Sequence, residues 1–390
     1  MKLRDLGFKG PITVITGEGY PIDRTKLSKA LITDPEKVYL QEPEWYKDGG
    51  IEFASDTAAS IDFSAKEVKT ASGKSHPYTK LILATGGTPK NLPLPGFKDL
   101  SNIFLLRQIS DTKKIMDAVG DKGKNIVVIG SSFIGMEVAN CLAKENTVTV
   151  VGMEEAPMER VMGKQVGEIF KKNLEKNGVK FCMGASVDSA VGSGSVKAIK
   201  LKDGTELEAD LVILGVGVGP ATEYLKDNSE IQLEEDGSVR VDDKFAVKGL
   251  KDVFAIGDIA TYPYHGPGGN GKPIRIEHWN VAQNMGRSVG QRIARPEEEP
   301  KPFIPIFWSA LGGQLRYCGS TPDGYDEVIL KGEPDNSKFA AYYAKGDEIV
   351  AMASMMMDPI MTKCAELMRR GQMLSKSDIQ SGKDPLQARL

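Results

Sequence analysis

The chain has 390 residues, which is too long for one ordinary hydrophobic core, so two or three domains are expected. With 41% hydrophobic and 26% charged residues, its composition is that of a folded globular protein and excludes a disordered one. A net charge of −3 offers no attraction to nucleic acid or an anionic membrane, and the longest apolar run, 211–219, is too short to span a bilayer.

The cysteine and histidine content does not support a metal or dithiol centre. The four cysteines have no close pair in the sequence, and the three histidines are too scattered to form a cluster. We therefore predict no metal site. Reduced cysteines are typical of an intracellular protein, either cytoplasmic or mitochondrial, and the sequence does not distinguish these two compartments.

The N-terminal segment has the pattern of the second half of a β-α-β nucleotide-binding unit. Residues 3–8 look like the end of a helix, residues 12–16 form a strand of good β-formers, and Glu18 follows in a glycine-rich loop. A carboxylate at this place binds a ribose hydroxyl in such units. No strand or glycine turn precedes residue 3 in this sequence, so we expect an unpaired sheet edge beside residues 12–16.

Short elements follow up to residue 119. Residues 23–31 predict a short polar helix or turn, and their composition favours a place on the surface. The stretch 59–85 predicts short strands, the last of them a buried strand over 81–84. Thr85 and Gly86 come directly after that strand, where small residues let a ligand approach the backbone. A proline-containing linker and a helix over 111–119 complete this part.

The clearest motif lies in residues 125–151, which predict a strand, a glycine turn, a helix and a second strand. Gly130 permits the turn, Gly135 lets the helix pack close to the strand, and backbone N–H groups around Ser132 can hold a pyrophosphate. The motif reads GSSFIG, so the middle glycine of a dinucleotide fingerprint is replaced. Taken alone, it is as compatible with a plain tight turn as with nucleotide binding. Glu154 is the first carboxylate after the second strand, because Gly152 stands at the usual ribose-binding position.

After residue 152 the chain alternates between helices and strands up to residue 293. The predicted helices cover 163–177 and 278–293, and the predicted strands and meanders cover 179–183, 187–208, 211–214, 239–246 and 253–258. Gly217 lies in a glycine-rich segment behind one buried strand, and Asp258 ends another, where open α/β sheets bind ligands. Residues 262–273 are predicted as a Gly/Pro-rich loop.

From residue 303 onwards the pattern changes to alternating strands, followed by a helix over 359–370. This pattern predicts a separate antiparallel α+β domain. The glycine-rich strand ends before it indicate two nucleotide-binding sheets rather than one, so the predicted fold class is α/β with a C-terminal α+β domain.

Several segments occur in the order that is typical of one group of flavoproteins. They are ILATGGTPK, VVIGSSFIGMEVA, VILGVGVGP, VFAIGDIA and RIEHWNVAQNMG, together with DRTKLSKAL and FWSALGGQLRYCG. On these segments the chain resembles apoptosis-inducing-factor-like proteins and the related ferredoxin reductases of the pyridine nucleotide-disulphide oxidoreductase fold. The resemblance implies an FAD-binding Rossmann-like domain in residues 1–110 and 238–300. It also implies an NAD(P)-binding one in 111–237 and an interface domain in 301–390.

The resemblance also implies which residues form the site. The residues implied for FAD are Glu18, Arg24, Lys29, Thr85, Gly86, Asp258, Glu277, His278, Trp279 and Trp308, and those for NAD(P) are Gly130, Ser132, Gly135, Glu154 and Gly217. Lys29 and Glu137 are implied to pair beside the flavin, where the lysine stabilises negative charge on the ring and the glutamate stabilises the lysine. Without the resemblance, Glu137 could equally be an acid placed in the first turn of a helix.

The implied function is an FAD-dependent NAD(P)H oxidoreductase that passes electrons to a ferredoxin-type protein, a quinone or dioxygen. NADH is slightly preferred, because Glu154 and Glu155 would repel a 2′-phosphate, although Arg160 could attract one. The alternative is a non-catalytic nucleotide-sensing or partner-binding protein that has lost FAD, as the missing N-terminal glycine turn suggests. A homodimer is compatible with either function.

Overall fold

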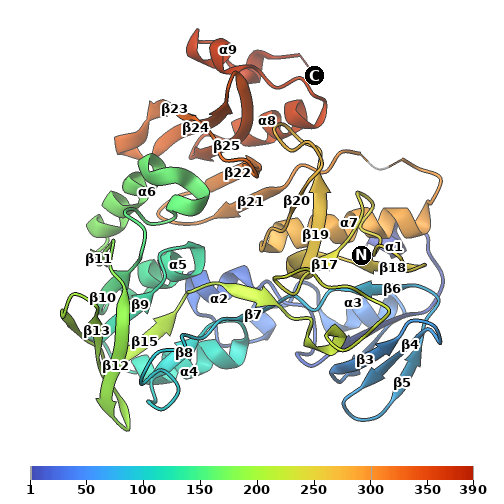
Figure 1. Cartoon of the computed structure of the whole chain (residues 1–390), viewed down its shortest axis with the longest axis horizontal. Helices are drawn as coiled ribbons and strands as arrows, with labels where there is room; N and C mark the ends of the chain where they lie inside the picture. The colour runs from blue at the N-terminus through green and yellow to red at the C-terminus, as the bar shows by residue number, and fades with distance from the viewer. Residues whose placement is uncertain (1, 300, 390) are drawn as a thin grey trace.

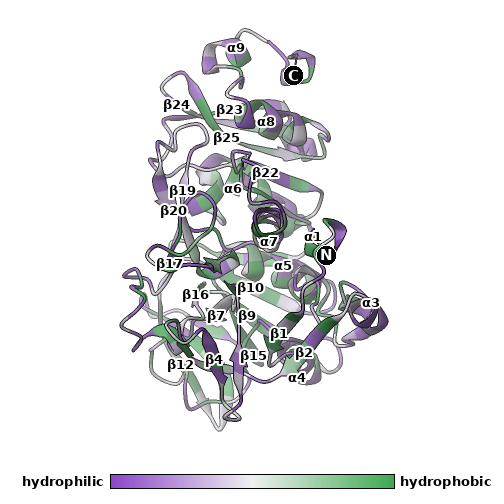
Figure 2. Cartoon of the chain, turned by 90° about the vertical axis from the view of Figure 1, so that its right-hand side faces the viewer, coloured by the Kyte–Doolittle hydropathy of each residue, from purple (hydrophilic) through white to green (hydrophobic). Residues whose placement is uncertain are grey.

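The computed structural model describes residues 2–299 and 301–389. Three groups of elements make up the molecule (Figure 1): the C-terminal sheet at the top of the view, a parallel sheet at the lower left, and the N-terminal elements at the right. In the view turned by 90°, helix α7 (Trp279–Ala294) is seen end-on between the C-terminal sheet above and strands β1 and β2 below (Figure 2). This helix therefore lies where the groups meet.

The parallel sheet has five strands in the order β11-β10-β9-β15-β8. The strands are β8 (Ile103–Leu105), β9 (Asn125–Ile129), β10 (Thr147–Val151), β11 (Val179–Cys182) and β15 (Leu211–Leu214). The helices of this part are α4 (Ile109–Val119), α5 (Phe133–Leu142) and α6 (Glu159–Lys176). All four residues of β15 are buried, as expected for a central strand covered on both faces. The unit β9-α5-β10 is the strand–turn–helix–strand that residues 125–151 predict, and this part is Rossmann-like.

A meander of β12 (Val187–Ser193), β13 (Ser195–Leu201) and β14 (Glu206–Glu208) connects β11 to β15. Helix α6 differs from its prediction, because it begins at Glu159, one turn before the predicted start. At Gly163 the backbone leaves the helix, with φ 77° and ψ 159°. The glycine that suggested a helix start is therefore the site of a kink, which glycine tolerates because it has no Cβ.

The N-terminal part contains two separate parallel strand pairs. Its elements are α1 (Lys2–Asp5), β1 (Ile12–Thr16), α2 (Thr25–Ala30), α3 (Pro43–Asp48), β2 (Ile51–Ser55), β3 (Ala58–Asp62), β4 (Glu67–Thr70), β5 (Ser75–Pro77) and β6 (Leu81–Leu83). Strand β1 pairs with β2, and β6 pairs with β18 (Val253–Ala255). Among the described residues no strand connects β1 with β6, so β1 has a partner on one side, as its sequence predicts.

Two predictions for this part are wrong. Residues 23–31 are not simply a surface segment, because Leu27 and Ser28 are buried where α2 packs against α5. The strand over 81–84 is not fully buried either, since Ile82 is 37% exposed. The first error arises because α5, which covers α2, is distant in sequence.

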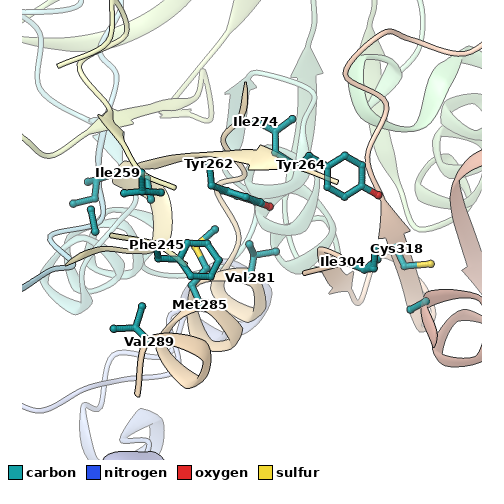
Figure 3. Close-up of a cluster of buried hydrophobic side chains, with 14 of the residues drawn as sticks. Phe245, Ile259, Tyr262, Tyr264, Ile274, Val281, Met285, Val289, Ile304 and Cys318 are labelled. Atoms are coloured by element: carbon teal, nitrogen blue, oxygen red, sulfur yellow. The ribbon is translucent and has the colours of Figure 1, made fainter. Parts of the chain in front are cut away.

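The chain returns to the N-terminal part through β17 (Val239–Arg240), β18, β19 (Ala260–Tyr264) and β20 (Lys272–Ile274). The predicted loop over 262–273 is wrong at both ends, because β19 and β20 pair antiparallel, with Tyr262 opposite Ile274. Tyr262 packs with Phe245 and Met285 in a buried cluster against α7 (Figure 3). This cluster fixes the helix whose N-terminal end contributes to the site.

The strand pairing and one hydrogen bond indicate where the second Rossmann-like domain begins and ends. Strand β8 belongs to the five-stranded sheet although it precedes residue 110, and Asn228 already donates to Ile61 O of β3 although it precedes residue 237. We therefore propose that the second Rossmann-like domain begins before β8 and ends before Asn228. The limits at 300 and 301 stay a prediction.

The C-terminal sheet is antiparallel in the order β21-β22-β25-β24-β23. Its elements are β21 (Ile306–Ser309), β22 (Leu315–Gly319), β23 (Glu327–Glu333), β24 (Lys338–Lys345), β25 (Glu348–Met355) and α8 (Ile360–Arg369). A short helix that the sequence did not predict, α9 (Lys376–Gln380), follows. The predicted α+β character is confirmed. Within the described residues, no helix has the length and apolar character needed to cross a membrane.

Candidate active site

Glu137 joins the three parts of the molecule. It lies on α5 and is 6% exposed, and its Oε1 is 2.9 Å from Lys29 Nζ on α2. Ser309 on β21 donates a hydrogen bond to the same Oε1 at 2.5 Å, and Ser28 on α2 donates to Oε2. The pairing of Lys29 with Glu137, implied by the resemblance, is therefore present in the geometry. The two serines were not predicted.

A second group of charges lies between α2 and the end of β18. Asp258 Oδ2 is 2.9 Å from Arg107 Nη2, and the Arg107 carbonyl accepts a hydrogen bond of 2.8 Å from Arg24 Nη1. Arg24 also pairs with Glu18, which accepts a further hydrogen bond of 3.1 Å from Gln108 Nε2. Arg107 thus links Glu18 and Arg24 to Asp258, which is more than 200 residues later in the chain. Arg107 was not predicted, although a cation just after β8 stands at a strand end where such sheets bind ligands.

Arg275 extends this group towards α7. It donates to the Asp258 carbonyl at 3.0 Å and to Glu277 Oε1 at 2.5 Å. Burial raises the pKa of Glu277, although the ion pair with Arg275 acts in the opposite direction. Glu277 lies directly before α7 and its aromatic residues, and its side chain is 30% exposed, so solvent still reaches the carboxylate.

His278, Trp279 and Trp308 meet where α7 begins and β21 passes. His278 Nε2 is 2.9 Å from the Trp308 carbonyl, and its Nδ1 accepts a hydrogen bond of 3.1 Å from the backbone N–H of Asn280. These contacts require a neutral ring with the proton on Nε2. The pKa of His278 is lowered to about 4, mainly by burial and to a smaller extent by the positive charge of Lys29, while the hydrogen bond to the Trp308 carbonyl acts in the opposite direction. The Trp279 and Trp308 rings have centroids 6.0 Å apart at 72°.

The electrostatic surroundings of His278 include both Lys29 and Asp258. Hydrogen bonds and ion pairs connect a series of residues, which we call the row. It begins with Glu18, Arg24, Arg107, Asp258, Arg275 and Glu277. It continues through His278 and Trp308 to Ser309, Glu137 and Lys29. This row brings together the predicted residues that are furthest apart in sequence.

Thr85 and Gly86 lie beside the row and connect the two Rossmann-like parts. Thr85 Oγ1 donates to the Ala221 carbonyl at 2.7 Å, and β7 (Gly87–Pro89) pairs antiparallel with β16 (Val218–Pro220). Gly217, which directly precedes β16, accepts a hydrogen bond of 2.9 Å from the backbone N–H of Lys90, so it lies at the other end of this pair from Gly86. Gly86 has φ 72°, and a Cβ there would lie 2.8 Å from the Arg107 guanidinium, so the turn leaves room for this side chain.

The glycine turn after β9 has the close packing that nucleotide-binding turns require. Gly130 has φ 108°, and a Cβ on Gly135 would lie 2.0 Å from the Gly130 carbonyl oxygen. Ser132 is exposed at the N-cap of α5, and its side chain makes no capping hydrogen bond. The first N–H groups of α5 are therefore not capped by this side chain, at the helix end that attracts anions.

Glu154 lies next to this turn. Its Oε2 accepts a hydrogen bond of 3.3 Å from Ser131 Oγ, and its Oε1 is 2.6 Å from Arg160 Nε. A Cβ on Gly152 would lie 2.5 Å from Ser131 Oγ, so there is no space for an acid at the usual position. Glu154 is therefore a carboxylate held next to the glycine turn, with Arg160 exposed beside it.

The residues of the row fit the flavin dinucleotide that the resemblance implies. The carboxylates of Glu18 and Asp258 suit sugar and ribityl hydroxyls, the guanidinium groups of Arg24 and Arg107 suit a diphosphate, and the ammonium group and aromatic rings near Lys29 suit the flavin ring. Among the described residues, no cluster of His, Cys, Asp or Glu has the arrangement of a metal site, and the four cysteines are free.

Comparison with known families covers nearly the whole chain. Residues 1–286 match the model of the pyridine nucleotide-disulphide oxidoreductase family, and residues 306–390 match that of the reductase C-terminal domain. Human apoptosis-inducing factor 3 is 37% identical over 383 residues, which are 97% of this chain and 62% of that protein. A monodehydroascorbate reductase from Cucumis sativus is 31% identical over 378 residues, 87% of this chain and 83% of that protein. The chain thus spans about three fifths of the length of apoptosis-inducing factor 3.

Solved structures show the same architecture. A ferredoxin reductase from Rhodopseudomonas palustris superimposes with a TM-score of 0.88 at 28% identity, covering 97% of this chain and 92% of that one. The putidaredoxin reductase–putidaredoxin complex gives a TM-score of 0.85 at 26% identity, with 95% and 89% covered. The predicted fold class, with two Rossmann-like domains and a C-terminal α+β domain, is confirmed. The chain belongs to the pyridine nucleotide-disulphide oxidoreductase family, whose members use FAD and NAD(P)H.

Proposed function

We propose that this chain is an FAD-dependent NAD(P)H oxidoreductase. The observation that supports this most is the meeting of Lys29 from the N-terminal part, Glu137 from the second Rossmann-like part and Ser309 from the C-terminal part at one buried carboxylate. Burying ions is costly, so a charged pair at a junction of three parts favours a functional use of its charge.

When bound, FAD would accept hydride from the reduced nicotinamide and supply electrons to an acceptor. The chain itself would bind and orient the two cofactors. Lys29 would place positive charge beside the flavin ring, and Glu137 would keep that ammonium group fixed. His278, held neutral by burial, adds no competing charge at pH 7. Trp279 and Trp308 exclude water from this end of the site.

The nicotinamide dinucleotide would lie over the turn from Gly130 to Gly135. N–H groups at the start of α5 would hold its diphosphate, and Glu154 would accept hydrogen bonds from the adenosine ribose. A 2′-phosphate would meet the Glu154 carboxylate, so NADH is slightly preferred to NADPH. The exposed Arg160 pairs with Glu154 and reduces this discrimination.

The acceptor is proposed to be a small molecule or a ferredoxin-type protein, in line with the structural similarity to a reductase in complex with putidaredoxin. Net charge argues against nucleic acid as a partner. A homodimer and an intracellular location, either cytoplasmic or mitochondrial, remain predictions from the sequence.

The test is an absorbance spectrum of the purified chain after incubation with FAD, followed by NADH and NADPH oxidation with ferricyanide, quinones and ferredoxins. We expect a protein-bound flavin band and faster reduction by NADH. A Lys29→Met variant should retain the band and lose most of the reduction rate. A protein that stays colourless yet binds NADH would refute the proposal.

That second outcome would support the alternative, a nucleotide-sensing or partner-binding protein without FAD. The specific observation in its favour is that β1–β2 and β6–β18 form separate pairs among the described residues, so the FAD-side sheet is in two pieces. The intact row from Glu18 to Lys29 argues for the oxidoreductase, because a protein that no longer binds FAD has no use for a buried charged pair at its centre.

A further inference from the structure

Three donors contact the carboxylate of Glu137, two at one oxygen and one at the other. Lys29 Nζ and Ser309 Oγ both contact Oε1, at 2.9 and 2.5 Å, whereas Ser28 Oγ contacts Oε2. Ser309 is 1% exposed and Ser28 is 7% exposed, so water does not replace either hydroxyl. Ser309 therefore competes with Lys29 for the same oxygen, and Ser28 does not.

Competition for one oxygen changes the strength of the charged pair. A hydroxyl that donates to Oε1 draws electron density towards itself and occupies a lone pair, so Oε1 attracts the ammonium group less strongly. Lys29 is held by little else, since its other contact is a distant one of 3.5 Å to the Thr25 carbonyl. The strength with which Glu137 holds the ammonium group of Lys29 therefore depends on whether the Ser309 hydroxyl is present.

We propose that Ser309 is a positioning residue that weakens the Lys29–Glu137 pair and thereby keeps the Lys29 charge available to the flavin. This inference rests on the proposed function for the flavin, while the effect on the pair itself does not. Ser309 arrives on β21, directly after Trp308, so the C-terminal domain contributes both the aromatic wall and the tuning hydroxyl. The position of the C-terminal domain would then affect the strength of the Lys29–Glu137 pair beside the flavin.

The first experiment measures the midpoint potential of protein-bound FAD by anaerobic titration against a reference dye. In Ser309→Ala, Lys29 turns more fully to Glu137 and stabilises the reduced ring less. We expect the equilibrium constant for flavin reduction to fall about tenfold, which is about 30 mV for a two-electron couple. Ser28→Ala should shift the potential less, because its hydroxyl is on the other oxygen. Ser309→Cys, of similar size but a weak donor, should behave like Ser309→Ala.

Ser354→Ala is the matched control. Ser354 is a fully buried serine of the same C-terminal sheet, and its hydroxyl has no hydrogen-bond partner in the described structure. A purely structural role for buried serine hydroxyls predicts equal potentials in the two variants. Equal potentials in Ser309→Ala and Ser354→Ala, or a larger shift in Ser28→Ala than in Ser309→Ala, would overturn the inference.

The second experiment needs no flavin. The coupling between Lys29 and Glu137 is measured by a double-mutant cycle of unfolding, once in the natural chain and once in Ser309→Ala. We expect a larger coupling in the Ser309→Ala background, and an equal or smaller one would contradict the inference. If the chain bound no FAD while the coupling rose as expected, the proposed function would fail and the role of Ser309 in the pair would stand.

Discussion

The strongest test of the site is a double-mutant cycle on the Lys29–Glu137 pair. Glu137 is 6% and Lys29 20% exposed, so removal of the lysine leaves a charge that solvent does not reach, at a cost of about 3 kcal/mol. Glu137→Gln costs less, about 2 kcal/mol, since the more exposed ammonium group can turn towards water. In the Glu137→Gln background there is no buried anion left to expose, so Lys29→Met then adds only about 1 kcal/mol. The double variant should therefore lose about 3 kcal/mol rather than the sum of about 5, which is a coupling of about 2 kcal/mol.

The assay is urea unfolding followed by tryptophan fluorescence, which reports on this region because Trp279 and Trp308 lie beside the pair. The exposed pair Lys122–Glu145, at 2.7 Å, provides a control cycle with similar geometry, and its side chains are 75% and 56% exposed. We expect a coupling below about 0.5 kcal/mol there, because solvent screens exposed pairs. If the two cycles gave the same coupling, burial would not be what makes the site pair strong, and the reasoning would be refuted.

Three further predictions concern His278, the contact between Tyr343 and Met162, and Gly135. The pKa of His278 is about 4 in the folded state, which is lower than in the unfolded chain. Acidification from about pH 6.5 to pH 4 should therefore remove up to about 3 kcal/mol of stability. His278→Asn should flatten this pH dependence of the unfolding free energy, measured by denaturant unfolding. Tyr343 donates a buried hydrogen bond of 2.8 Å to the Met162 carbonyl, so Tyr343→Phe should cost about 1–3 kcal/mol, whereas Tyr342→Phe should change stability by less than about 0.5 kcal/mol in the same assay. Gly135→Ala would place a Cβ 2.0 Å from a carbonyl oxygen of the glycine turn, and we expect NADH binding in calorimetry to weaken at least tenfold; unchanged affinity would show that this turn does not hold the nucleotide.

The regular elements of the fold could be read from local sequence because their patterns are local. The buried run of β9, the turn at Gly130 and the apolar face of α5 lie within 20 residues of one another, and the structure has them where the sequence predicts. The pair β19–β20 was missed for the opposite reason. Pro263 and Pro273 suggested a loop, but they stand opposite each other in a short edge pair, a place that tolerates proline.

Burial was harder to predict than secondary structure. The polar sequence of 23–31 favours the surface, yet α2 packs against α5, a helix more than 100 residues later in the chain. Ser28 is buried there because its hydroxyl has a charged acceptor, which removes the usual cost of burying a polar group. Nothing within residues 23–31 identifies that acceptor, so a local reading assigns the serine to solvent.

The same distinction explains which site residues could be found. Lys29, Glu137 and Asp258 are charged residues whose place in a motif suggests a role, and the structure brings them into one row. Ser309 has no such signal, because serine is common and hydrogen-bonds almost anywhere. Its effect on Glu137 exists only when β21 lies against α5, and these elements are separated by more than 150 residues. A residue that acts by sharing an acceptor with another group can therefore be identified only from the folded arrangement, and here the shared oxygen Oε1 of Glu137 is the feature on which the proposed role of Ser309 rests.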